Sequence, residues 1–155
     1  FIEISERLNL VFAISRDGFV SCISLVDGRY LHGLELEMSE PSLFAVSKSG
    51  YVTVAFNGPD SSVVFVLDQN LEIINTARFD STIVCWTPAE KLGIDLLAIV
   101  FKNQNLTIFD YPKLSHPLIS RNWFIKIKSI AFSRKPMPKI SLGTDDGKII
   151  IIDLI

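Results

Sequence analysis

The residues that could do chemistry in this chain of 155 residues are few and widely separated. His32 and His116 are 84 residues apart, and neither has a cysteine or a carboxylate at the spacing of a metal site. No Gly-x-Ser-x-Gly elbow is present, and Cys22 and Cys85 lie in apolar stretches where a small apolar residue would serve. We therefore expect no catalytic residue and no metal site. We interpret both cysteines as buried, structural free thiols, as in a reducing compartment.

One pair of adjacent acidic residues could form a cation site. Asp145 and Asp146 precede Gly147, and two adjacent carboxylates could hold a cation. A turn is the competing interpretation and the one we favour, because Asp and Gly suit tight turns and Asp17-Gly18 stands between two apolar runs in the same way. The sequence also lacks a Gly-x-x-x-x-Gly-Lys loop, and residues 143–147 lie between two expected strands, with no helix to receive an anion. No cofactor is expected.

Composition excludes several classes of protein. The chain holds 15 Lys and Arg against 17 Asp and Glu, a net charge of −2, which excludes a strongly basic nucleic-acid binder. Hydrophobic residues make up 48% of the chain, but the longest uninterrupted apolar run covers only residues 96–101. That is far below the ~20 residues that span a bilayer. The chain opens at Phe1 without a secretion signal, and we expect a globular piece of a longer protein.

The local pattern predicts an all-β chain. Short runs rich in Val, Ile, Phe and Thr are broken about every ten residues by turn residues, at Asp17-Gly18, Asp27-Gly28, residues 57–60 and Asp146-Gly147. Helical periodicity is almost absent. Asp-Gly between two apolar runs predicts a hairpin with a type I′ turn, which needs positive φ at both central residues.

The strands recur in four copies of one unit. In each copy one strand ends in an apolar residue followed by Ser24, Asp68, Asp110 or Asp153, which are 44, 42 and 43 residues apart. A turn lies seven residues upstream of each position. Because the aspartates recur by repeat position, we expect them to cap backbone amides rather than to catalyse a reaction.

Each unit is expected to hold four strands. The units cover residues 1–37, 42–79, 82–124 and 128–155, and the last lacks its fourth strand. Runs such as 63–67 and 149–152 are apolar at every position, which predicts that both faces of these strands are buried. Four-stranded units of ~40 to 45 residues are typical of β-propeller blades. A β-sandwich is the alternative, but it does not predict a regular period. We therefore predict that residues 1–155 form part of a β-propeller.

The strands expected in the third unit contain both tryptophans of the chain. Its first two strands are expected at 82–87 and 95–101, with Trp86 packed in the inner strand. Its fourth strand is expected near 118–124, and Trp123 has the parity of a core residue.

Two stretches of the chain carry charge of predominantly one sign. Residues 121–139 hold six basic residues and no acidic one: Arg121, Lys126, Lys128, Arg134, Lys135 and Lys139. Such a stretch can attract an acidic partner, an anionic lipid headgroup or a phosphopeptide, although a solvated face is the competing interpretation. Glu35, Glu37 and Glu40 occupy the connection between the first two units. The candidate binding surface comprises Lys126, Lys128, Arg134, Lys135, Glu37 and Glu40, a pattern suited to a mixed-charge protein surface.

The units resemble degenerate WD40 repeats. Leu67-Asp68, Phe109-Asp110 and Ile152-Asp153 stand where that family has its Trp-Asp pair, and His32-Gly33 reverses its Gly-His pair. Residues 11–18, 27–31 and 142–150 more closely resemble the last blades of the propeller in BEACH-domain proteins, the neurobeachin and beige relatives. That resemblance implies a large scaffold in vesicle trafficking that acts through protein partners. It also implies that a strand from before the first repeat completes the last blade.

The expected function is a non-enzymatic protein-interaction scaffold in the cytoplasm. Its rim would consist of the loops at residues 15–18, 57–62, 102–105 and 144–147, together with the connections between units. Its expected partners are other proteins, the rest of its own propeller or further copies of itself, because open blades expose apolar faces. A phosphoinositide or anionic-membrane binder using residues 121–139, with peripheral membrane association, is the second hypothesis. A WD40 scaffold of another pathway and a propeller enzyme complete the alternatives, the enzyme being disfavoured because no His or carboxylate set converges at aligned positions.

Overall fold

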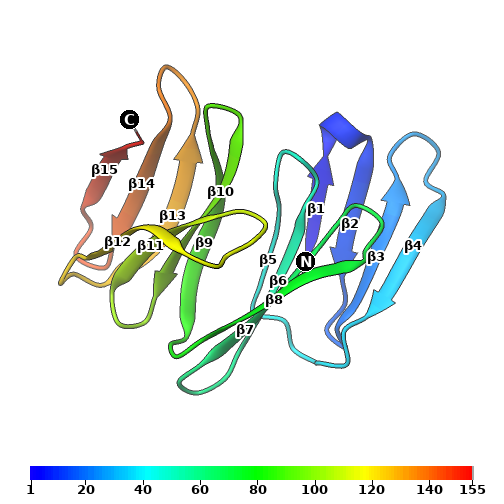
Figure 1. Cartoon of the computed structure of the whole chain (residues 1–155), viewed down its shortest axis with the longest axis horizontal. Helices are drawn as coiled ribbons and strands as arrows, with labels where there is room; N and C mark the ends of the chain where they lie inside the picture. The colour runs from blue at the N-terminus through cyan, green and yellow to red at the C-terminus, as the bar shows by residue number, and fades with distance from the viewer. Residues whose placement is uncertain (155) are drawn as a thin grey trace. The chain divides into compact units, whose positions relative to one another are not determined.

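The computed structural model describes residues 1–154, which form β-strands joined by short loops (Figure 1). Ile155, the end of the fourth expected unit, lies outside the described residues. The strands are β1 (Ile2–Ser5), β2 (Leu10–Ile14), β3 (Phe19–Ser24), β4 (Tyr30–Glu35), β5 (Leu43–Val46), β6 (Val52–Asn57), β7 (Ser62–Leu67), β8 (Ile73–Phe79), β9 (Ile83–Lys91), β10 (Ile94–Phe101), β11 (Asn105–Asp110), β12 (Pro117–Asn122), β13 (Ile127–Ser133), β14 (Lys139–Thr144) and β15 (Ile149–Asp153). A single 3-10 turn, Glu6–Leu8, precedes β2 within the described residues.

The strands form four antiparallel sheets in which consecutive strands are neighbours. We call β1–β4 blade 1, β5–β8 blade 2, β9–β12 blade 3 and β13–β15 blade 4. This confirms the predicted all-β fold of four blades, with the fourth strand missing from the last blade within residues 1–154. The chain divides into two compact units: unit 1, Phe1–Phe79, holds blades 1 and 2, and unit 2, from Asp80 onward, holds blades 3 and 4.

Unit 1 has its core between blades 1 and 2. Side chains alternate between the two faces of a strand, so β2 directs Phe12 and Ile14 into the core while Val11 and Ala13 face the other side. Phe12 is fully buried, and Val54 and Phe56 of β6 belong to the same apolar cluster. The inner strands β1 and β5 lie side by side.

Unit 2 is built in the same way. Alternate residues of β10, namely Leu96, Ala98 and Val100, join Ile140 and Leu142 of β14 in one buried cluster. The inner strands β9 and β13 are in contact. Trp86 is buried as expected, and Trp123 is half-buried and packs against this cluster.

The hairpins form where Asp-Gly predicted them, but the turn type is different. Gly18 and Gly147 have φ of +85° and +82°, whereas the preceding Asp17 and Asp146 are not in the left-handed region. The Gly18 amide donates to the Ser15 carbonyl at 3.1 Å, and the Ser15 amide donates to the Phe19 carbonyl. These are the contacts of a type I turn closed by a left-handed glycine, which needs positive φ at one residue instead of two.

A type I′ turn occurs instead where the sequence pattern did not predict one. Strand β9 continues to Lys91, beyond its expected range of 82–87, whereas β10 begins only one residue before its expected range of 95–101. The two strands pair as far as Lys91 with Ile94. The turn residues Leu92 and Gly93 have φ of +52° and +80°. The result is a long hairpin whose free end projects from unit 2 (Figure 1).

The prediction that both faces of residues 149–152 are buried is wrong. Ile149 and Ile151 are 74% and 61% exposed, whereas Ile150 and Ile152 pack against the core of unit 2. The reason is that blade 3 covers only one face of blade 4, and no described residue of unit 2 covers the other face. Blade 1 shows the same asymmetry in unit 1, because Ile2 and Ile4 on β1 are 70% and 58% exposed.

Candidate functional site

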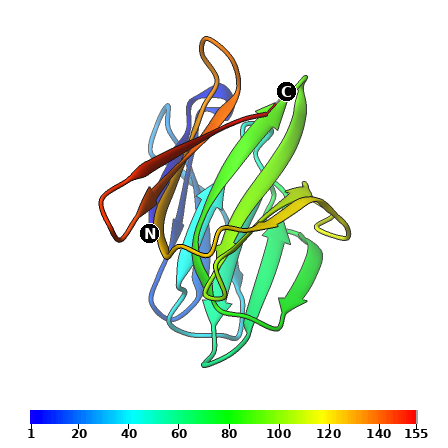
Figure 2. The same ribbon diagram turned by 90° about the vertical axis from the view of Figure 1, so that its left-hand side faces the viewer.

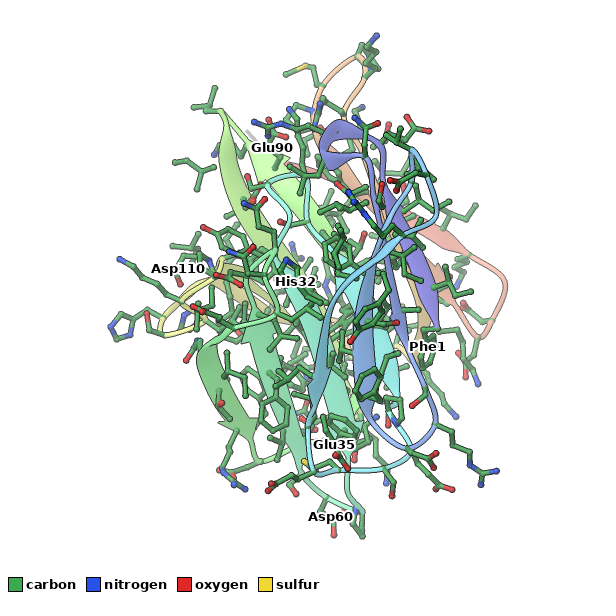
Figure 3. All side chains as sticks on the ribbon, turned by 90° about the vertical axis from the view of Figure 1, so that its right-hand side faces the viewer. Phe1, His32, Glu35, Asp60, Glu90 and Asp110 are labelled. Atoms are coloured by element: carbon green, nitrogen blue, oxygen red, sulfur yellow. The ribbon has the colours of Figure 1, made fainter. Side chains whose placement is uncertain are left out.

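The connection between blades 1 and 2 forms one side of an open hollow of about 430 Å³ in unit 1. Phe1, Ile14, Ser15, Arg16, Glu40 and Pro41 line it. It lies at the end of the unit where the β2–β3 turn and the β4–β5 connection meet. Figure 3 places Glu35 and Asp60, at the end of β4 and in the β6–β7 loop, toward one end of this unit.

Backbone and side-chain hydrogen bonds hold the connection in one path. The Leu36 amide donates to the Gly18 carbonyl at 3.1 Å, and the Glu40 amide donates to the Arg16 carbonyl at 2.7 Å. On the other side, the Ser42 hydroxyl accepts from the Asn57 amide at 3.1 Å. The loop between the blades is therefore attached to the turns of both blades.

The candidate residues Glu37 and Glu40 lie in this connection, and both have left-handed backbones, with φ of +55° and +59°. A left-handed conformation costs a non-glycine residue roughly 1–2 kcal/mol. The Arg16 guanidinium lies 2.6 Å from the Glu40 carboxylate, and both side chains are largely exposed. The pair thus presents opposite charges at the mouth of the hollow, on a backbone that the neighbouring turns hold in a strained shape.

A second hollow of about 350 Å³ lies where β1 and β5 end. Ile4 to Arg7 line one side of it, and Val46, Ser47 and Lys48 line the other. This site was not predicted from the sequence. The available signal was the pair of short, mainly polar segments that follow the first strands of blades 1 and 2, at residues 6–9 and 47–50.

The structure divides the four basic candidate residues between the two ends of β13. Lys126 and Lys128 lie where the chain enters this strand, and the Lys126 carbonyl accepts from the Asp145 amide at 3.0 Å. Arg134 and Lys135 follow the strand at its far end. Seven extended residues span about 20 Å, so the contiguous basic stretch does not form one patch. Arg121 lies against the Trp123 ring instead, 4.1 Å from its centre.

The recurring aspartates have different partners. One Asp68 carboxylate oxygen accepts from the amides of Asn70 and Glu72, both at 2.9 Å, which is the expected capping. Asp153 lies 3.3 Å from the Lys139 ammonium group, whereas Oδ1 of Asp110 is buried and has no hydrogen-bond partner among residues 1–154. Capping is therefore seen at one of the three positions.

Asp146 acts within its own turn. Its carboxylate accepts from the Thr144 hydroxyl and lies 2.7 Å from the Lys148 ammonium group. The hydrogen bonds from Lys148 and Thr144 lower the pKa of Asp146 to about 2. Residues 145–147 thus lie in the turn between β14 and β15.

The cysteines differ in burial. Cys22 is completely buried in the core of unit 1, as expected, whereas Cys85 is only half-buried beside the core of unit 2. Burial raises the pKa of both thiols, that of Cys85 to about 11. Within residues 1–154, no three His, Cys, Asp or Glu side chains lie together as metal ligands would, and no helix has the length and apolar character of a membrane span.

Solved structures with the same blade arrangement come from several kinds of protein. A structure of BBS1N in complex with ARL6DN matches with a TM-score of 0.78 and 17% identity over 94% of this chain and 44% of that one. The β-propeller domain of Cps50 (Swd1) from Myceliophteria thermophila matches with a TM-score of 0.73 and 14% identity over 99% of this chain and 50% of that one. The chain has a WD40-like β-propeller fold.

A third propeller chain belongs to an enzyme. Dihydro-heme d1 dehydrogenase NirN, in complex with DHE, matches with a TM-score of 0.73 and 17% identity over 99% of this chain and 34% of that one. This chain therefore spans half or less of the length of these three chains. No family model matches the sequence. No curated protein matches it either.

Proposed function

We propose that the chain is a non-enzymatic protein-interaction module that binds an extended segment of a partner at the hollow between blades 1 and 2. The observation that carries this proposal is the Arg16–Glu40 pair, which lies at the edge of that hollow on a connection held by both blades. A preorganised site loses less conformational entropy on binding than a mobile loop does. The exposed pair can recognise charges of both signs, and Ile14 and Pro41 supply apolar contact.

Peptide selection tests this proposal while the partner is still unidentified. A displayed library of unstructured peptides is selected against the chain, and a selected peptide is then titrated against variants. Arg16→Ala with Glu40→Ala should weaken binding by about ten-fold, and added salt should weaken it further. Arg7→Ala with Lys48→Ala, at the second hollow, is the matched control. Loss of binding in the control but not in the first variant would place the site at the other end of unit 1.

The narrower proposal is a trafficking scaffold of the BEACH-domain type in the cytoplasm. It is supported by the resemblance of residues 11–18, 27–31 and 142–150, and by the absence of cysteine pairing in the described chain. BBS1N, a propeller of similar fold, is in complex with ARL6DN, which supports protein partners for such a fold. The sequence that precedes Phe1 in the intact protein tests the narrower proposal, because a BEACH domain there would agree with it and an unrelated domain would contradict it.

Contact with an anionic membrane or phosphoinositide surface is the second candidate function. It is favoured by the exposure of Arg134 and Lys135 in the β13–β14 loop. Sedimentation with vesicles that contain phosphatidylserine tests it. Charge reversal at the membrane-facing end should abolish binding, so Lys128→Glu and Lys135→Glu distinguish the two ends of β13.

A further inference from the structure

We propose that the free end of the β9–β10 hairpin inserts into the interface of an anionic membrane, with Leu92 as its apolar apex. This inference rests on the second candidate function and identifies the part of the chain that would enter the lipid. Leu92 is 92% exposed, and Ile94, two residues further on, is 61% exposed. Transfer of large apolar side chains from water to the boundary of the acyl chains lowers the free energy, and the apex of a projecting turn can reach that boundary.

The neighbouring β13–β14 loop contributes a further exposed apolar side chain at the same end of unit 2. The hairpin and this loop both reach that end in two perpendicular views (Figures 1 and 2). The Arg134 guanidinium forms an ion pair with the Glu90 carboxylate, which joins the loop to the hairpin. Met137 in the loop is 51% exposed. The two loops therefore carry three exposed apolar side chains at one end of the unit.

Charge at this end favours an anionic surface. The hairpin end and the loop carry the basic residues Lys91, Arg134 and Lys135, against the acidic residues Glu90 and Asp95, of which Asp95 is buried. Lys139, the next basic residue, is paired with Asp153. Apolar side chains flanked by cations are typical of segments that lie at the boundary of headgroups and acyl chains.

The backbone of the hairpin also suits a lipid interface better than a protein pocket. Antiparallel pairing continues to Lys91 and Ile94, so only the two turn residues leave the ladder. A polar backbone group without a partner is costly in hydrocarbon, and this hairpin confines such groups to its two turn residues, so few of them enter the interface. The apolar side chains stand on a convex end, where a fluid surface can surround them.

Vesicle sedimentation of the full chain tests the proposal with matched variants. Vesicles of phosphatidylcholine alone are compared with vesicles containing about one-third phosphatidylserine. Leu92→Asn removes the apolar apex but retains a residue that tolerates positive φ, so the hairpin should still form. Phe124→Asn is the control, because Phe124 is also 87% exposed with φ of +54° but lies before β13, at its other end. Leu92→Trp and Phe124→Trp report polarity through tryptophan emission, measured as a difference from the wild type with its Trp86 and Trp123.

The expected result is sedimentation with the anionic vesicles, lowered about ten-fold by Leu92→Asn and changed less than about two-fold by Phe124→Asn. Emission from Leu92→Trp should shift to shorter wavelength on binding, and that from Phe124→Trp should not. Unchanged sedimentation of Leu92→Asn, with no shift for Leu92→Trp, would overturn insertion while leaving the second candidate function in place. Failure of the wild type to sediment would overturn both.

Discussion

Gly18 lies directly against the backbone carbonyl of Met38. A β-carbon at residue 18 would stand 1.8 Å from that oxygen, and Gly18 also has φ of +85°. The contact joins the β2–β3 turn to the connection that carries Glu37 and Glu40. The sequence explains Gly18 by the conformation of its turn alone, but the packing against Met38 also requires a glycine at this position.

Gly18→Ala should destabilise unit 1 and displace this connection. Left-handed φ alone costs roughly 1–2 kcal/mol, and the contact with Met38 adds to it, so we expect a loss of about 3 kcal/mol or more in the free energy of unfolding. Urea denaturation followed by circular dichroism measures it.

Gly28→Ala is the matched control for this loss. Gly28 lies in the same blade with φ of +69°, but nothing stands within 4 Å of its β-carbon position. It should show the backbone cost alone, about 1 kcal/mol. Equal losses in both variants would show that the Met38 contact has no energetic role.

The Asp146 turn should give a small acid-dependent change in stability. Its folded pKa of about 2 is below the ordinary 3.8, so the ionised carboxylate favours the folded state above pH 4, and this contribution is lost as the pH falls from about 4 to about 2. The carboxyl carbon shift of Asp146, followed by NMR, measures the folded pKa. Lys148→Gln should raise it toward 3.8, because the ammonium partner is the main cause of the shift. A value near 3.8 in the unmodified chain would contradict the turn geometry.

Neither cysteine should react with a thiol reagent in the folded chain. Cys22 is completely buried, and burial raises the pKa of Cys85 to about 11, so little thiolate is present at pH 8. Ellman's reagent should detect both thiols only after addition of concentrated guanidinium chloride. Rapid reaction of one thiol before denaturation would place Cys85 outside the unit 2 core, and Cys85→Ala should then abolish that reaction.

The open faces of blades 1 and 4 should cause the isolated chain to associate. Ile2 and Ile4 expose one face of blade 1, and Ile149 and Ile151 expose one face of blade 4. Exchange of each pair for threonine keeps the β-branched shape but lowers the apolar area, so sedimentation velocity should show less association for both double variants. A wild-type chain that stays monomeric over a wide concentration range, with a cooperative melt, would contradict this interpretation.

Local pattern was sufficient for much of the fold. Apolar runs with β-branched residues predicted the strands, and the recurrence of Ser24, Asp68, Asp110 and Asp153 predicted four similar units. The weakest local prediction was the β9–β10 hairpin. Leu92-Gly93 does not look like an Asp-Gly or Asn-Gly turn, so the predicted strands stop short of the observed ones.

The candidate site was predictable only in part. The loop at residues 15–18 and the acidic connection were both singled out, but nothing in the sequence showed that Arg16 pairs with Glu40 at the edge of the hollow. The basic stretch shows the reverse case, because residues adjacent in the chain are separated once β13 extends between them.

The sequence by itself determined where strands and turns form and that one unit recurs, because these follow from the alternation of side chains along each strand and from the residues that break it. Only the tertiary structure decided which faces are covered and which loops meet. Ile149 and Ile150 are the same residue type in the same strand, yet one is exposed and the other packs against a core. Coverage of a strand depends on a neighbouring blade, and that neighbour lies far away in the chain.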